Sequence, residues 1–400
     1  MTHFVFGMPA TGENLYDREE LLDKIVSRLS SIKRGARNNV VLLGPRRTGK
    51  TSALYACAKQ LQSIGVVSII VDCEGYDLPS FLRHYGNCVI DAKLQNSGII
   101  INFVERVKAG ATALISSLSE ALGRLKAIQI GSGIENYIQF RIEFEQITKS
   151  RELTPDELNA LFDKTVGLTD DLGFPVAVMF DEFQETSTYS LPRGKFLDNF
   201  RNAVQPQRNV VYAYSGSSTG LIRDIFSKGP MAGSADVITV DPFSREISKN
   251  FLKAGLGPKK ATIDESAAEE AYRFTSGIAL YLNWMGLFFL DHTKTEGQVS
   301  IDKVRLAEEE MLSPISPVYH ILEKQLTKCG HKLVLTLNAL SRGHKTTSGI
   351  AAEVPNSSTQ AIRTYLERLI SYGIVSVNKD REYSILDPVL STFILKKIAD

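Results

Sequence analysis

The sequence lacks the cysteine pattern of a metal site or a disulfide framework. Its four cysteines show no Cys-x-x-Cys spacing and its six histidines are scattered, so we predict no structural zinc. No signal-peptide pattern is found near the first residue. We therefore expect a cytoplasmic protein whose thiols stay reduced.

The sequence also lacks a dominant charge and a long apolar run. The formal net charge of +1 gives no global attraction to nucleic acid or to an anionic membrane, so any such contact must be local. The longest apolar run, 278–290, is interrupted by Asn283 and is too short to cross a bilayer, which favours a buried helix. With 43% hydrophobic and 23% charged residues, the 400-residue chain is typical of a globular protein of two or three domains.

The sequence does contain a complete phosphate-binding loop. Residues 44–51, GPRRTGKT, match G-x-x-x-x-G-K-[ST] between an apolar segment, 39–43, that predicts a buried strand and a segment, 51–62, that predicts a helix. Glycines let backbone N–H groups turn toward phosphate, and the helix N-terminus favours an anion. We predict that a nucleoside triphosphate is bound by Gly44, Pro45, Arg46, Arg47, Thr48, Gly49, Lys50 and Thr51.

Individual residues of the loop and of a second strand have predicted roles. Lys50 would reach the β- and γ-phosphates, and the Thr51 hydroxyl would ligate Mg²⁺. The apolar strand 174–180 ends in two acids and is expected to lie beside the strand of the loop. Asp181 would hold Mg²⁺, and Glu182 would orient or deprotonate the attacking water. Acids also cap ordinary strands at a surface, so this pattern has weight only together with the loop.

A third strand, 209–215, runs into a serine-rich turn. Ser217 is the candidate for a polar residue that senses the γ-phosphate, although such a turn also has an ordinary structural explanation. The predicted strands alternate with helices, which indicates an α/β fold with a parallel sheet covered by helices on both faces. The ligand would then lie at the C-terminal ends of the strands, which are 39–43, 66–72, 174–180, 209–215 and 236–240.

The chain divides into three predicted parts. Residues 1–241 form the ATPase domain, in which about 80–165 is interpreted as a decoration; a partner-docking surface and simple packing both remain open for it. Within that region, 100–125 has helical spacing, 137–145 alternates as a strand or hairpin would, and a helix is expected from Thr154. Residues 242–313 are predicted as a helical subdomain. In 314–400, helices followed by a hairpin give the outline of a winged helix.

The order of these motifs resembles a known family. Asp17-Arg18-Glu19-Glu20-Leu21, GPRRTGKT, VAVMFDEFQE, SGSS and the winged-helix outline together look like an archaeal AAA+/STAND-type P-loop ATPase, a relative of the archaeal origin-recognition initiators. The resemblance covers nearly the whole chain and is weakest at 80–165. It implies an adenine pocket that includes Tyr16 and Arg18, a helical lid over the nucleotide, ATP and Mg²⁺ as cofactors, and a switch between ATP and ADP states.

Two departures from the family pattern bear on turnover. A segment like Pro-Leu-Tyr-Gly-Arg, whose arginine can contact the γ-phosphate, is here Pro230-Met-Ala-Gly-Ser234. Such an arginine increases the rate of hydrolysis on the order of 10³-fold or more in related enzymes. Arg223 or Lys228 are possible substitutes. The Gly-x-Pro of the lid is here Gly277-Ile-Ala279. Both departures favour slow hydrolysis.

The winged-helix outline offers cations for nucleic acid. The candidate contacts are Arg363 and Arg368 on the presumed recognition helix and Lys379 and Arg381 at the wing tip. Residues 330–400 carry only nine Lys/Arg against six Asp/Glu, which is modest for a dedicated DNA-binding unit.

We therefore predict a slow Mg-ATP-hydrolysing switch that contacts duplex DNA in the replication or maintenance of a cellular or mobile genome, with two alternative functions beside this first one. The second is a signalling or assembly switch whose winged helix packs internally and whose 80–165 region binds a protein partner. The third is a degenerate ATPase that binds nucleotide without turnover. A homo-oligomer in which a neighbouring subunit supplies the missing arginine is compatible with the sequence. No membrane contact is expected.

Overall fold

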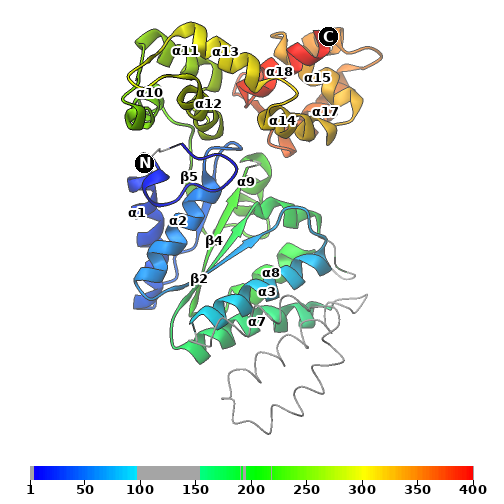
Figure 1. The fold of residues 1–400 in the computed structure, drawn as a ribbon. Coiled ribbons are helices and arrows are strands. Elements are labelled where there is room, and N and C mark those ends of the chain that lie inside the picture. Colours follow the sequence, from blue (N-terminus) through cyan, green and yellow to red (C-terminus); the bar gives the residue numbers. More distant parts are fainter. Residues whose placement is uncertain (1–3, 97–153, 190, 192–194, 218, 400) are drawn as a thin grey trace, which may run out of the picture.

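The computed structural model describes residues 4–96, 154–189, 191, 195–217 and 219–399. Its lower half in Figure 1 is built on a five-stranded sheet in the order β2-β3-β4-β1-β5. Every neighbouring pair in this sheet is parallel, which confirms the predicted parallel α/β fold. The strands are β1 (Val40–Leu43), β2 (Val67–Asp72), β3 (Val176–Asp181), β4 (Val210–Gly216) and β5 (Asp236–Thr239).

Helices cover both faces of the sheet, as the apolar strands require. On β4, Val211 and Ala213 pack in the core formed with α1 (Glu19–Ser30) and α2 (Lys50–Ser63). The alternate residues, Tyr212 and Tyr214, pack in the core of the opposite face. That face is covered by α3 (Leu78–Asn96), α7 (Pro155–Leu172), α8 (Phe196–Val204) and α9 (Thr219–Ser227) (Figure 1).

The two ends of the predicted decoration belong to this covering layer. Phe81 and Tyr85 of α3 and Phe162 of α7 are fully buried and contact the ring of Phe180 or its neighbours in the core. The predicted boundaries near 80 and 165 therefore fall within helices that pack on the sheet. The expected helix at 100–125 and the alternating segment at 137–145 lie outside the described residues.

The strand order corrects one expectation. β3, which carries the two acids, was expected to lie directly beside β1, but β4 lies between them. All three strands still end at the same edge of the sheet because they are parallel. The end of β4 is thereby placed between the phosphate loop and the acid pair.

The upper half in Figure 1 is predominantly helical. Its first part contains α10 (Arg245–Gly255), α11 (Glu265–Thr275), α12 (Ala279–His292) and α13 (Ile301–Met311), with a short parallel pair, β6 (Thr262–Ile263) and β7 (Gln298–Val299). The second part, called here the C-terminal unit, contains α14 (Pro317–Thr327), α15 (His331–Ser341), α16 (Thr347–Glu353), α17 (Thr359–Ser371), the antiparallel hairpin β8 (Val375–Val377) and β9 (Tyr383–Ile385), and α18 (Pro388–Ala399).

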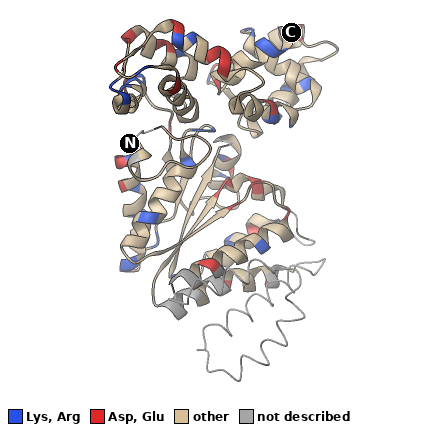
Figure 2. Ribbon diagram, in the orientation of Figure 1, with Lys and Arg blue, Asp and Glu red and all other residues tan. Residues whose placement is uncertain are grey.

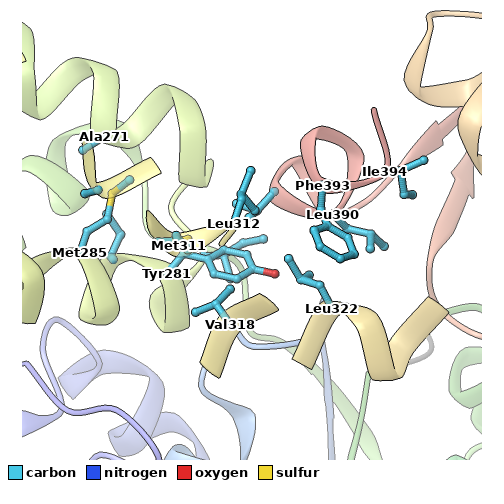
Figure 3. Close-up of a cluster of buried hydrophobic side chains, with 14 of the residues drawn as sticks. Ala271, Tyr281, Met285, Met311, Leu312, Val318, Leu322, Leu390, Phe393 and Ile394 are labelled. Atoms are coloured by element: carbon cyan, nitrogen blue, oxygen red, sulfur yellow. The ribbon is translucent and has the colours of Figure 1, made fainter. Parts of the chain in front are cut away.

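These two helical parts share one hydrophobic core. Tyr281 and Met311 from the first part and Leu322, Leu390 and Phe393 from the C-terminal unit belong to the same cluster of buried side chains. Figure 3 shows the ring of Tyr281 with its hydroxyl pointing toward the C-terminal unit. The first helical part, called here the lid after its predicted role, and the C-terminal unit therefore pack as neighbours with a continuous apolar contact.

Charged residues of both signs occur on the described helices. Figure 2 shows lysine and arginine interspersed with acidic residues over the described helices, in keeping with the net charge of +1. Among the described residues, no helix has the length and apolarity needed to span a membrane.

Candidate nucleotide-binding site

The phosphate loop joins β1 to α2, and its geometry explains both fixed glycines. Gly49 has φ of +97°, a conformation that strains any residue with a Cβ. A Cβ on Gly44 would collide with the carbonyl oxygen of Val240 at the end of β5. The loop can therefore pass close to β5 and turn into the helix only with glycine at these two positions.

Lys50 is buried within this loop. Its ammonium donates to the carbonyl oxygens of Gly44 and Pro45, at 3.0 and 2.6 Å. Burial lowers the pKa of Lys50 to about 8, although the charges of Glu182 and Asp181 act in the opposite direction. Within the described part of the chain, the hydrogen bonds of this ammonium go to neutral carbonyls, and an anionic phosphate is a stronger hydrogen-bond partner.

The predicted Mg²⁺ ligands lie together. The Thr51 hydroxyl donates to Asp181 Oδ2 at 2.6 Å, and the Ser215 hydroxyl donates to Oδ1 of the same carboxylate. Burial raises the pKa of Asp181, and the hydrogen bonds from Ser215 and Thr51 oppose this shift. Hydroxyl and carboxylate oxygens are the hard donors that Mg²⁺ prefers, so this pair fits the ion.

Glu182 is held by two side chains after a sharp turn of the backbone. Its φ of 51° is left-handed. The Ser217 hydroxyl and the Gln184 amide donate to its Oε2, at 2.7 and 2.5 Å. Burial acts to raise the pKa of Glu182, but the charge of Lys50 and these hydrogen bonds outweigh it, so the pKa is lowered. Ser217, the predicted γ-phosphate sensor, is thus in direct contact with Glu182.

A cavity of about 320 Å³ connects the loop with the lid. Tyr16, predicted for the adenine pocket, lines it together with Ala279 and Leu280 at the start of α12. Arg18 also lines it and donates to the carbonyl oxygens of Thr48 and Asp241, at 3.2 and 2.8 Å. The cavity is therefore lined both by phosphate-loop residues and by apolar residues at the start of α12, and the two meet where the backbone N–H of Leu280 donates to the carbonyl oxygen of Arg47 at 3.3 Å.

Arg47 connects the loop to the other two parts of the chain. Its guanidinium donates to the hydroxyl of Tyr281 at 2.6 Å and to Asp387 Oδ2 at 2.5 Å. A further hydrogen bond of 2.7 Å reaches Gln325 Oε1 on α14. Arg47 itself has φ of 68°, a left-handed conformation that is costly for a residue with a side chain. Sequence reasoning assigned Arg47 to the nucleotide and gave no signal of these partners.

Ser234 lies away from the nucleotide site. It precedes β5, and its carbonyl oxygen accepts a 2.9 Å hydrogen bond from Asn39, which precedes β1. The phosphate loop begins at the other end of β1. Four residues of strand span about 13 Å, so position 234 is at the opposite edge of the sheet. The interpretation that an arginine here would contact the γ-phosphate of its own subunit does not fit this geometry. The suggested substitutes, Arg223 and Lys228, do not line the cavity.

The predicted DNA contacts are all exposed. Arg363 and Arg368 lie on α17, and Lys379 and Arg381 lie in the turn between β8 and β9. Arg368 donates to the hydroxyl of Tyr372 at 2.7 Å. The C-terminal end of α17 packs against α9 of the ATPase domain.

Two other polar residues at this edge were missed from the sequence. Ser215 is the next-to-last residue of β4 and contacts Asp181, and Asp72 ends β2 in register with Asp181. The sequence signal that could have identified them was a polar residue at the end of a predicted parallel strand, because the C-terminal ends of parallel strands meet at one edge of the sheet.

The loop, the acid pair and the sheet order define a P-loop ATPase. A family model described as an ATPase domain predominantly from Archaea matches residues 15–284. The chain belongs to this family. No curated protein matches the sequence significantly.

Solved structures share the fold over nearly the full chain. The Walker-type ATPase PABY2304 of Pyrococcus abyssi is 21% identical with a TM-score of 0.68, covering 98% of this chain and 99% of its own. The ORC2 protein of Aeropyrum pernix, in its ADPNP-ADP complexes, is 14% identical with a TM-score of 0.54, covering 96% of each chain. At such identities the likeness concerns the fold.

Proposed function

We propose that the chain is a slow ATPase whose nucleotide state sets the position of its C-terminal unit. The observation that carries this is the Arg47 network, because the loop that would hold the phosphates is also bonded to Tyr281, Gln325 and Asp387. A ligand shifts a conformational equilibrium only if it binds one state better than the other. A phosphate that moves the loop around Arg47 would also move the hydrogen bonds by which Arg47 holds the C-terminal unit. The phosphate would therefore bind the two positions of that unit with different affinity.

The site residues have the following roles in this proposal. Lys50 binds the β- and γ-phosphates, and Thr51 and Asp181 hold Mg²⁺, which when bound neutralises part of the phosphate charge. Glu182 orients and deprotonates the attacking water through Oε1, since Oε2 accepts the hydrogen bonds of Ser217 and Gln184. Tyr16 and the apolar start of α12 contact the base.

The C-terminal unit would contact duplex DNA as a winged helix. The support is the succession α15, α16, α17 and hairpin, together with four exposed cations on α17 and the turn. The biological setting would be the replication or maintenance of a cellular or mobile genome.

The test compares ATP hydrolysis by wild type and Glu182→Gln, with and without mixed-sequence duplex. Stimulation by DNA that is absent in Glu182→Gln supports the proposal. Binding of the duplex must also weaken steeply with salt. Reversal of the four cations should abolish binding, whereas reversal of four exposed cations elsewhere should not; the control set is Lys24, Arg34, Lys59 and Arg208.

A second function is favoured by one contact. α17 packs against α9 so closely that a Cβ on Gly220 would lie 3.2 Å from Ile370 Cγ2. A signalling or assembly switch would use the C-terminal unit internally in this way and recruit a protein partner through the 80–165 region. In that case the four charge reversals leave both hydrolysis and partner assembly intact, and duplex DNA has no effect on turnover.

A further inference from the structure

The position of Ser234 leaves open which cation of this subunit meets the γ-phosphate in addition to Lys50. Phosphoryl transfer needs positive charge on the transferred group, and an arginine is the usual source. Position 234 is at the opposite edge of the sheet, as its contact with Asn39 shows. The candidates are therefore the cations that lie around Glu182.

A second cavity of about 270 Å³ adjoins the nucleotide cavity and shares Glu182 and Arg47 with it. Its other cations are Arg46 of the phosphate loop and Lys324 and Lys328 of the C-terminal unit. The charge of Arg47 is already paired with Asp387.

The remaining cations of this cavity differ in their availability. Lys328 is paired with Glu74 at 3.3 Å, and Lys324 is an exposed residue of α14. Arg46 is different, because its Nε is buried and has no hydrogen-bond partner in the described part of the chain. A buried guanidinium nitrogen without a partner carries a desolvation cost that an anionic ligand would remove.

Arg46 also acts electrostatically on both catalytic groups. Burial acts to raise the pKa of Glu182, and the positive charge of Arg46 adds to the larger lowering effects of Lys50 and Ser217 that outweigh it. The same charge adds to the lowering of the Lys50 pKa, which is caused mainly by burial. Its guanidinium is therefore close enough to influence the region between Lys50 and Glu182, where the γ-phosphate of the proposed substrate would lie.

We propose that Arg46 contacts the γ-phosphate of ATP bound to the same subunit and stabilises the charge that develops on it during hydrolysis. This inference rests on the proposed ATPase function. Water attacks the γ-phosphorus, the bond from the bridging oxygen to that phosphorus breaks, and its electron pair stays on ADP. The proton of the water passes to Glu182 and then to the phosphate released. Arg46 exchanges no proton and serves as a fixed charge.

The test measures the affinities of wild type, Arg46→Ala and Arg46→Lys for ADP and for the non-hydrolysable ATP analogue AMP-PNP. We expect Arg46→Ala to lose at least about tenfold in AMP-PNP affinity, a loss typical of a charged hydrogen bond, with less than about threefold change for ADP. Its kcat should fall on the order of 10²- to 10³-fold. Arg46→Lys should recover part of both losses, and Arg208→Ala, an exposed arginine before β4, should change neither.

Two failures are distinguishable. If wild type binds AMP-PNP and ADP, but Arg46→Ala weakens both equally or neither, the role of Arg46 is contradicted and the ATPase proposal stands. If wild type binds neither nucleotide, the proposed function itself fails. The affinity ratio does not depend on turnover, so the test holds even for a very slow enzyme.

Discussion

Arg47 and Asp387 lie 340 positions apart in the sequence and form an ion pair with 2.5 Å between NH1 and Oδ2. Their side chains are only 11% and 12% exposed. The hydroxyl of Tyr281 donates to the same Oδ2 at 2.5 Å and accepts from Arg47. One buried network thus joins the phosphate loop, the lid and the end of the chain. Since an unpaired buried charge is costly, these three parts are expected to separate cooperatively.

The first prediction concerns the strength of this link. Arg47→Met should lower the free energy of unfolding by about 3 kcal/mol, because it leaves the Asp387 carboxylate buried without its partner. The double variant with Arg47→Met and Asp387→Leu should lose much less free energy of unfolding than the sum of the losses in the two single variants. Chemical denaturation of the two single variants and the double variant measures the coupling. The exposed pair Lys328 and Glu74 is the control, with an expected coupling below about 1 kcal/mol. Equal coupling for both pairs would contradict the argument.

The second prediction concerns Ser217. Because its hydroxyl donates to Glu182, Ser217→Ala should lower kcat about tenfold, as expected for a misplaced general base, with little change in the affinities for ATP and ADP. Steady-state kinetics and calorimetric titration give both quantities. A sensor of the γ-phosphate would behave differently, since its loss would weaken ATP relative to ADP. That result would support the role predicted from the sequence, in which Ser217 senses the γ-phosphate.

The third prediction concerns Mg²⁺. The hydroxyl of Thr51 is bonded to Asp181 and is a proposed ligand of the ion. Thr51→Val should remove most of the increase in AMP-PNP affinity that Mg²⁺ causes, whereas Thr51→Ser should retain it. Titrations in Mg²⁺ and in EDTA provide the comparison. An unchanged Mg²⁺ effect in Thr51→Val would exclude this hydroxyl as a ligand.

The fourth prediction concerns Glu308 on α13, away from the nucleotide. Burial, with a smaller contribution from Glu270, raises its pKa to about 7, and its Oε1 is buried without a partner among the described residues. Folding therefore favours the protonated form. The stability that this group supports is complete below the unfolded pKa of about 4.5 and is lost as the pH rises toward 7.

Glu308→Gln should accordingly stabilise the protein at pH 8 by on the order of 1 kcal/mol, discounted because the side chain is only half-buried, and by little at pH 5. Thermal or chemical unfolding at both pH values measures the difference. Glu309→Gln, at the exposed neighbouring position, should have no such pH-dependent effect. If Glu308→Gln changed the free energy of unfolding equally at pH 5 and at pH 8, the carboxylate would not be destabilised by burial.

Local signals predicted the central features of the fold. Each of the five predicted strands agrees with an observed strand to within two residues at either end, because apolar runs bounded by turn residues are a local pattern. The phosphate loop and the acids Asp181 and Glu182 were found in the same way, and the structure brings them together. α18 was missed although Pro388 and the spacing of Val389, Leu390, Phe393 and Ile394 gave a signal.

The remaining features depend on long-range packing. The partners of Arg47 could not be predicted, because nothing near the loop specifies where Tyr281 and Asp387 will lie. The location of Ser234 at the far edge of the sheet follows only from the strand order and direction. The contact of α17 with α9 likewise depends on how the C-terminal unit packs against the ATPase domain.

In the proposed function, nucleotide state moves the C-terminal unit through Arg47. The most direct measurement is the distance between labels at the exposed positions Gln62 on α2 and Lys396 on α18, by single-molecule fluorescence or electron spin resonance, in Glu182→Gln protein. We expect the distance distribution to differ between Mg-ADP and Mg-ATP, and Arg47→Met to remove this difference. Identical distributions in the two nucleotides, with both nucleotides shown to be bound, would show that the nucleotide does not set the position of the C-terminal unit.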